Sequence, residues 1–213
     1  MQKLTILIIS LVVSNSICAQ VIDNFSVELN LGRYAKTTGL FEEGYYSNEF
    51  TYINGFNIGY THTQNLSYFI GFRRVNSTIN SGGGVSIESS SVSGMEFRLG
   101  AKFSYQREKR LFLNFGLELF GEFANQKGTY WVDYPPTYEI NHRKKYLGFA
   151  PSIELNLRIV DRIIFFIETR YRFGIVNLIP IESTQPNKEL FPSQKYWLNI
   201  LDPINSIGLR FEL

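Results

Sequence analysis

The chain is almost without cysteine. Its single cysteine among 213 residues, Cys18, falls inside an N-terminal segment with the features of a secretory signal peptide. Lys3 supplies the positive start, an apolar run extends from Leu4 to Val13, and cleavage is expected after Ala19. Acylation of Cys18 is the alternative, but Ile17 beside it does not suit that processing. Without residues 1–19, the chain can form no disulfide and offers no thiolate to a metal or substrate.

Long apolar runs and an excess of one charge are also missing. Beyond the N-terminal segment, no apolar run approaches the roughly 18 residues that a membrane-spanning helix needs. Removal of Lys3 leaves 20 basic and 19 acidic residues, without the clustered basic face that nucleic-acid binding requires. The mature chain is therefore expected to be soluble, or to cross a membrane only as a closed barrel.

Histidine is scarce as well, with His62 and His142 the only two. They are far apart in the sequence, and neither has a cluster of ligand residues beside it, so we predict no metal site and no cofactor. Threonine and serine lie near His62, which leaves a lipid-modifying membrane enzyme as an alternative. No arrangement of nucleophile, base and orienting group is visible from the spacing, so no catalytic residue and no enzymatic activity are predicted.

What the chain has is alternation, clearest in a hairpin from Leu147 to Ile175. Every second residue is apolar, from Leu147 to Ile159 in one arm and, with Thr169 as the exception, from Ile163 to Ile175 in the other. The residues between them include glycine, serine, glutamate and arginine. Because successive side chains of a strand point to opposite sides, one face of this hairpin is apolar and the other polar.

The same pattern predicts eight strands in residues 20–213, treated as one domain. Three short turns are expected, at Thr63–Asn65, Gln106–Arg110 and Val160–Arg162. Four long polar loops are expected near 37–48, 76–91, 126–143 and 177–195. An even number of antiparallel strands with short turns at one end and long loops at the other is typical of an outer-membrane barrel. We therefore predict an all-β fold: an eight-stranded antiparallel up-and-down transmembrane β-barrel.

The apolar face is predicted to touch lipid and the polar face to line the lumen. Glycines collect on the polar face, which suits the crowded interior of an eight-stranded barrel, and the charges there are mixed in sign, as buried charges must be. A soluble lipocalin-like barrel with the apolar face inside is the alternative. The predicted structural charge network of the lumen comprises Glu96, Arg98, Lys102, Glu118, Glu122, Glu154, Arg158, Glu168, Arg170, Arg172, Arg210 and Glu212.

On these residues the mature chain resembles the small eight-stranded outer-membrane barrels of the OmpX and OmpA transmembrane-domain type, and more narrowly the outer-membrane β-barrel proteins of Bacteroidota. The ending GLRFEL carries part of the likeness, with Ile207, Leu209, Phe211 and Leu213 alternating. The resemblance implies a C-terminal strand that the barrel-assembly machinery reads. It departs from the family in ending on leucine rather than an aromatic residue.

These features favour a non-enzymatic protein of the bacterial outer membrane, in contact with its lipids. The short turns and both termini would be periplasmic and the four loops extracellular, in a structural, adhesive or partner-contact role. A narrow passive channel is the alternative. The third loop offers a candidate contact patch for an extracellular protein or glycan, at Tyr130, Trp131, Tyr134 and Tyr138. The alternative, which the pattern favours, is a loop folded over the barrel mouth or an aromatic belt at the lipid headgroups.

Overall fold

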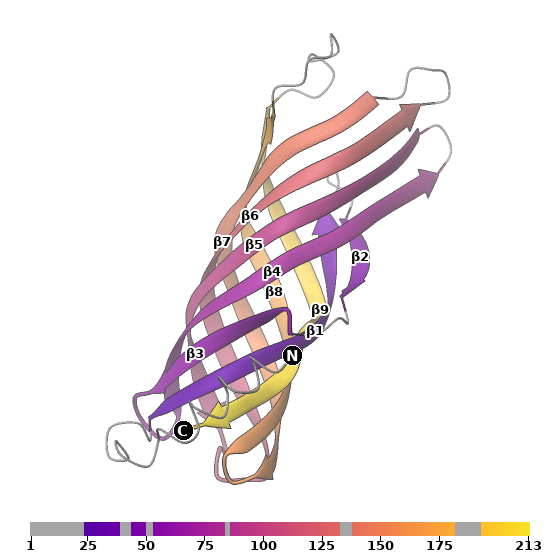
Figure 1. Cartoon of the computed structure of the whole chain (residues 1–213). Helices are drawn as coiled ribbons and strands as arrows, with labels where there is room; N and C mark the ends of the chain where they lie inside the picture. Colours follow the sequence, from indigo (N-terminus) through magenta and orange to yellow (C-terminus); the bar gives the residue numbers. More distant parts are fainter. Residues whose placement is uncertain (1–23, 39–43, 50–52, 84–85, 133–137, 182–192) are drawn as a thin grey trace, which may run out of the picture.

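The computed structural model describes residues 24–38, 44–49, 53–83, 86–132, 138–181 and 193–213, which form one β-sheet closed into a ring (Figure 1). None of these residues belongs to a helix that could cross a bilayer. The signal peptide predicted at 1–19 lies outside the described residues. The strands are β1 (Phe25–Thr38), β2 (Gly44–Glu49), β3 (Gly55–Thr61), β4 (Leu66–Gly83), β5 (Ser86–Tyr105), β6 (Leu111–Val132), β7 (Tyr138–Val160), β8 (Ile163–Pro180) and β9 (Gln194–Glu212).

The wall of the ring has eight strand positions for nine labelled strands, because β2 and β3 occupy the same position beside β1. Both pair with β1: residues 25–30 of β1 pair with β3, and residues 33–38 pair with β2. From β3 onward each strand pairs antiparallel with the next, and β9 returns to pair with β1. The predicted eight-stranded antiparallel up-and-down barrel is confirmed, and the three short turns lie where the sequence places them.

The predicted loops are much too long. β4 and β5 pair as far as Gly83 and Ser86, and β6 and β7 pair as far as Tyr130 and Tyr138, through segments assigned to loops. The last strand begins at Gln194 instead of near the chain end. β7 has 23 residues, which at about 3.3 Å per residue and a tilt of about 45° spans roughly 50 Å of barrel height, against about 30 Å for the hydrocarbon of a bilayer.

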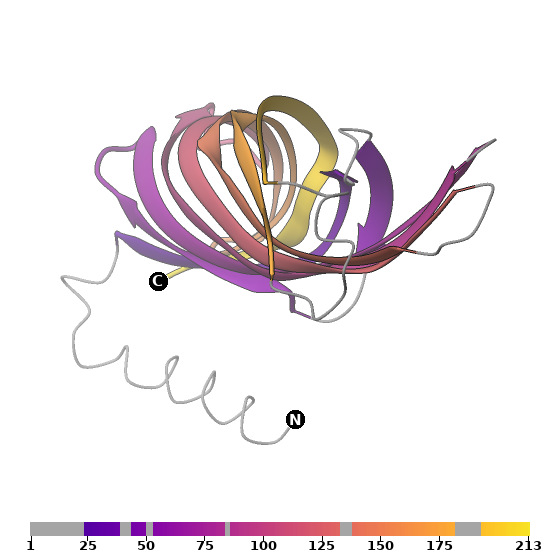
Figure 2. The same cartoon turned by 90° about the horizontal axis from the view of Figure 1, so that it is seen from above.

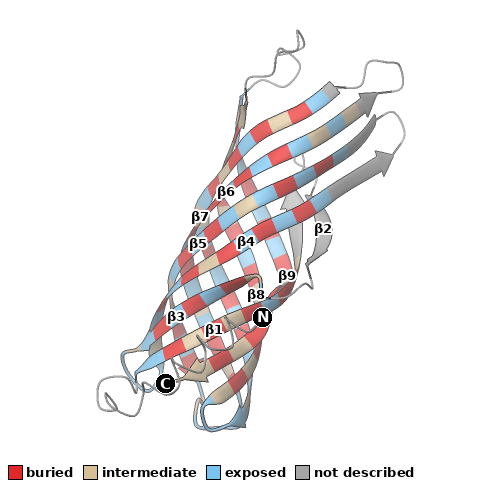
Figure 3. Cartoon of the chain, in the orientation of Figure 1, coloured by how far each residue is buried: buried red, intermediate tan, exposed pale blue. Residues whose placement is uncertain are grey.

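The two faces of the wall differ as predicted for a membrane barrel. Inward buried residues alternate with more exposed outward ones along most of the wall (Figure 3), with breaks at Gly32–Arg33 of β1 and at Pro203–Ser206 of β9. Leu117 is 59% exposed on the outside, whereas Glu118 beside it is 2% exposed and Arg170 1%. A soluble barrel with an apolar interior would show the reverse, so the apolar outer surface identifies this as the membrane-spanning type of barrel.

The polar–apolar alternation changes phase toward the end opposite the short turns: apolar side chains occur on the inward face there, and polar ones on the outward face. There the inward face gains apolar residues, including Val75, Val92 and Ile140, beside polar ones such as Gln126, and the outward residues include the polar Asn76 and Lys127. This is the pattern of a β-structure surrounded by water. The change marks the height at which the wall leaves the hydrocarbon, and β4, β5 and β6 continue beyond it and bend away from the ring (Figures 1 and 2).

Glycine is required where β7 and β8 come together. Gly148 and Gly174 face each other in register, and a methyl group on either would collide with the backbone of the opposite strand. At Gly100 on β5, a Cβ would meet the backbone oxygen of Leu117 on the opposite strand and also the side chains of Glu118 and Phe69. Glycine thus allows the strands to approach closely at both places, and at Gly100 it also leaves room for larger interior side chains.

We predict that Leu117→Arg destabilises the folded barrel by about 2–4 kcal/mol, because it places a cation among lipid tails at the middle of the apolar outer surface. The matched control is Thr129→Arg, on the same outward face of β6 but beyond the change of phase, which is expected to have little effect. Urea unfolding of both variants in lipid vesicles measures the difference. An equal loss in the free energy of unfolding for the two variants would contradict the assignment of the lipid-facing belt.

Candidate functional site

The interior of the barrel is filled with charged side chains. Among the residues whose burial is described, seven acidic and eight basic ones are buried, so the enclosed charge is close to balanced. The acidic ones are Glu28, Glu96, Glu118, Glu122, Glu154, Glu168 and Asp202. The basic ones are Arg33, Arg73, Arg98, Lys102, Lys144, Arg170, Arg172 and Arg210.

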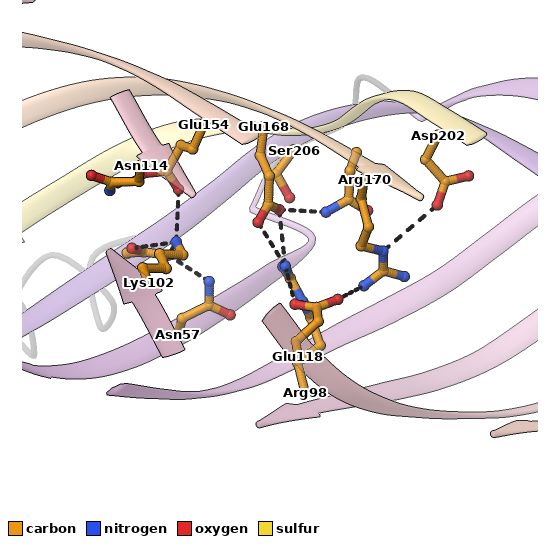
Figure 4. A network of polar contacts seen from close by, with 12 residues as sticks. Asn57, Arg98, Lys102, Asn114, Glu118, Glu154, Glu168, Arg170, Asp202 and Ser206 are labelled. Atoms are coloured by element: carbon orange, nitrogen blue, oxygen red, sulfur yellow. Dashed lines mark hydrogen bonds and ion pairs between the residues drawn. The ribbon is translucent and has the colours of Figure 1, made fainter. Parts of the chain in front are cut away.

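Nearest the short turns, Lys102 and Arg210 share two carboxylates. Lys102 Nζ donates to Glu154 Oε2 at 2.7 Å and to Glu28 Oε1 at 3.0 Å. Arg210 Nε donates to the same Glu28 oxygen at 2.7 Å, and its Nη2 to Glu154 Oε1. Asn57 adds a hydrogen bond to Glu28. The contacts join β1, β3, β5, β7 and β9 across the lumen, and Figure 4 shows Lys102, Glu154 and Asn57 of this group.

The middle of the lumen is crossed by a second group (Figure 4). Arg98 Nε donates to Glu118 Oε2 at 2.7 Å, and its Nη2 to both oxygens of Glu168 at 2.9 Å. Arg170 binds the other oxygen of Glu118 through Nη1 and Glu96 Oε2 through Nη2, the latter at 2.8 Å. Each of these two arginines therefore bridges two carboxylates, and Glu118 is held between both.

Glu96 connects this group to the far side of the ring. Arg73 Nη2 donates to Glu96 Oε1 at 2.7 Å, while Arg73 Nη1 donates to the backbone oxygen of Asn205 at 2.9 Å. The side-chain amide of Asn205 in turn donates to Glu168. These contacts add β4 to the strands that the network joins and connect it to β9.

Toward the extended end, Arg172 lies between Asp202 and Glu122. Its Nε is 2.7 Å from Asp202 Oδ2, and its Nη1 donates to Glu122 Oε2 at 3.0 Å. Lys144 Nζ is 3.1 Å from the other oxygen of Glu122. Every carboxylate described in these four groups therefore faces at least one cation, as burial demands.

Aromatic rings lie among the charges. Three of the buried phenylalanines have a cation of the network over the ring: Lys102 lies 4.9 Å from the centroid of Phe69, Arg170 5.1 Å from that of Phe120, and Arg210 5.6 Å from that of Phe166. Such contacts stabilise a desolvated cation further. They also occupy space that water would otherwise fill.

Apolar layers lie above and below the network. At the short-turn end, Phe112, Ile164 and Phe166 are buried within the barrel. At the other end, Tyr146 and Leu178 belong to a buried apolar cluster on β6 to β9. A water-filled passage would leave the side chains that line it exposed, whereas Arg170 and Glu118 are almost fully buried. The lumen is therefore closed at the level of the network.

The structure places ten of the twelve predicted network residues in the buried interior, and Arg158 and Glu212 at its rim. These two lie 3.7 Å apart near the short turns, and Arg107 lies 2.6 Å from Glu212. The sequence did not identify five further charged residues that share the interior: Glu28, Arg33, Arg73, Lys144 and Asp202. Glu28 and Arg73 had the correct phase on predicted strands, which could have identified them.

The predicted aromatic contact patch is not placed in a loop. Tyr130 lies within β6, and its side chain is half-buried against the inward apolar cluster. Trp131 is also in β6, Tyr138 begins β7, and Tyr134 lies outside the described residues. Tyr130 therefore belongs to the interior packing, because the hairpin of β6 and β7 extends further than its polar sequence indicated.

The two histidines lie at opposite ends of the barrel. His62 is exposed in the turn after β3, with its ring beside that of Tyr68. His142 is buried within β7 rather than in a loop. Over the described part of the chain, no three residues of the metal-binding types come together.

Comparisons with known proteins found no matching family model and no matching curated protein. Solved structures are similar at low identity. Outer membrane protein AlkL is 12% identical with a TM-score of 0.44, over 88% of this chain and 89% of that chain. CarO of Acinetobacter baumannii is 11% identical at 0.41, over 87% and 98%. The outer membrane protease OmpT of Escherichia coli is 10% identical at 0.43, over 91% and 98%.

We predict that Glu118→Gln destabilises the barrel by about 3–5 kcal/mol, because it leaves Arg98 and Arg170 buried without a full counter-charge. The control is Arg107→Gln, which breaks the partly exposed pair with Glu212 and should cost about 0–1 kcal/mol. Unfolding by urea in lipid vesicles reports both values. If the two variants lost the same stability, the interior would have to be hydrated.

Proposed function

We propose that this chain is a non-enzymatic protein of the bacterial outer membrane, whose closed barrel anchors an extended sheet outside the membrane for contact with a partner. The observation that carries the proposal is the buried ion-pair network, since a lumen filled by paired charges leaves the outer surface and the extended strands as the parts that can act. The resemblance to the small barrels of the OmpX type, including those of Bacteroidota, supports the proposal, as does the predicted signal peptide.

The extended sheet offers a suitable contact edge. β4 pairs with β3 only as far as Arg73, opposite Gly55. Beyond that point β4 continues to Gly83 paired with β5. Among the described pairings its other edge has no ladder partner, although β2 approaches part of it. An edge without a ladder partner presents backbone donors and acceptors to which an extended segment of another protein can add. Its outward side chains, Asn76 and Thr78, are polar and exposed.

The proposed orientation places the short turns in the periplasm and the extended strands outside the cell. The mature chain would carry no cysteine, so single cysteines can be introduced without a background. We expect Thr78→Cys to react with a membrane-impermeant maleimide on intact cells, and Gln64→Cys to react only after the cells are lysed. The opposite pattern would reverse the orientation, and no reaction difference would place the protein elsewhere.

A narrow passive channel is the alternative function. Because the network leaves no exposed path at Arg170 and Glu118, we expect the purified protein to show no steady openings in planar bilayers. Steady openings of the wild type that disappear or change size in Glu118→Gln or Arg170→Gln would establish the channel instead. An empty-vesicle preparation and heat-denatured protein provide the baseline.

A further inference from the structure

The outward surface carries a group of cations just beyond the apolar belt. Along β7 the apolar outward residues end at Leu147, and the next outward positions are Lys145 and Arg143. Along β9 they end at Trp197, which is 72% exposed, and the next position is Lys195. Lys127 lies on the outward face of β6. All four lie just beyond the level at which the outward side chains change from apolar to polar, on the side away from the short turns.

The strand register brings these cations together. Lys145 pairs with Asn177, and Asn177 pairs with Lys195, so the two lysines lie two strands apart in one row. At about 4.8 Å per strand, their backbones are roughly 10 Å apart. Lys127 pairs with Asn141, two residues from Arg143, which makes it a diagonal neighbour at about 7–8 Å. The flexible side chains can therefore converge on one ligand.

These cations differ from those in the lumen. Inside, the arginines and lysines of the network are held by carboxylates, whereas in the described part of the chain no acidic side chain lies within ion-pair distance of Lys127, Arg143, Lys145 or Lys195. One carboxylate, Glu139, shares the outward face of β7 but lies further from the belt. The rim at the short turns is different, since Arg107 and Arg158 there face Glu212.

We propose that Lys127, Arg143, Lys145 and Lys195 form a binding site for the phosphate groups of an outer-leaflet lipid whose acyl chains lie along the apolar belt below. The site rests on the membrane location and orientation of the proposed function. Charge complementarity and continuity with the apolar belt favour this occupant. A lipid phosphate lies at the boundary of the acyl chains, which is where these cations are. A soluble acidic protein would bind the cations without using the adjoining apolar surface. Lysine and arginine close to an anionic membrane surface each contribute favourably to binding.

The test uses the full mature chain in detergent with two probes: lipid A carrying two phosphates, and the same lipid after removal of both. Native mass spectrometry measures the fraction of barrel that retains each lipid. We expect the wild type to prefer the phosphorylated lipid by at least about tenfold. The triple variant Arg143→Gln, Lys145→Gln, Lys195→Gln should lose most of this preference, and rising salt should weaken it in the wild type.

The matched control is Lys109→Gln, Arg110→Gln, Arg162→Gln, which removes three cations at the short-turn end and should keep the preference. Heat-modifiable gel migration verifies that each variant is folded, and the three single variants replace the triple if it does not fold. Excess inorganic phosphate should not displace the lipid if the belt contributes to binding. No preference for the phosphorylated lipid in the wild type, or an equal loss of that preference in the control variant, would overturn the site.

The maleimide test of orientation is independent of this outcome, so failure of the site and failure of the proposed location can be told apart.

Discussion

The structure depends on one constraint: each strand crosses two surroundings, and each face must suit the medium it meets. In the middle of the wall the outside is hydrocarbon, so side chains such as Leu117 and Leu155 cover it and all charge is confined to the interior. Beyond the lipid the outside is water, and the apolar residues, such as Val75 and Val176, move to the inside. The phase change is therefore a consequence of crossing the membrane boundary.

Charge confined to a narrow interior must be paired, and the pairing here is shared among many strands. Glu118 is held by Arg98 and Arg170, and Glu96 by Arg73 and Arg170, so no single pair can be separated from its neighbours. A buried pair adds little net stability over an apolar equivalent, but removing one partner is costly. The network therefore acts mainly on specificity: a shift of any strand by one residue would send its charges into lipid and leave their partners unpaired.

The fold can be predicted from the sequence where apolar and polar residues alternate regularly. The alternation from Leu147 to Ile175 predicts both a hairpin and the face of it that contacts lipid. Where apolar residues are consecutive, alternation is hidden, and Phe120 and Phe166 could not be recognised as inward side chains. Asp202 was missed because Pro203 beside it interrupts the pattern, although β9 continues through both. The long loops were predicted because polar residues such as Asn76 and Lys127 face water on strands that have left the membrane, where an apolar outer face is no longer needed.

A closed interior changes where function can reside. In a barrel with an open lumen, the inward side chains meet the solute and the outside serves only as an anchor. Here the inward charges pair with one another. The side chains of Lys145 and Lys195 are on the outside, and no described carboxylate lies within ion-pair distance of them. The same is true of the backbone: at the short-turn end each strand pairs with a neighbour on both sides, whereas β4 beyond Arg73 has a ladder partner on one side only among the described pairings. The groups still able to bind a second molecule, a lipid at the boundary or an extended segment above it, are therefore those that the closed ring does not use.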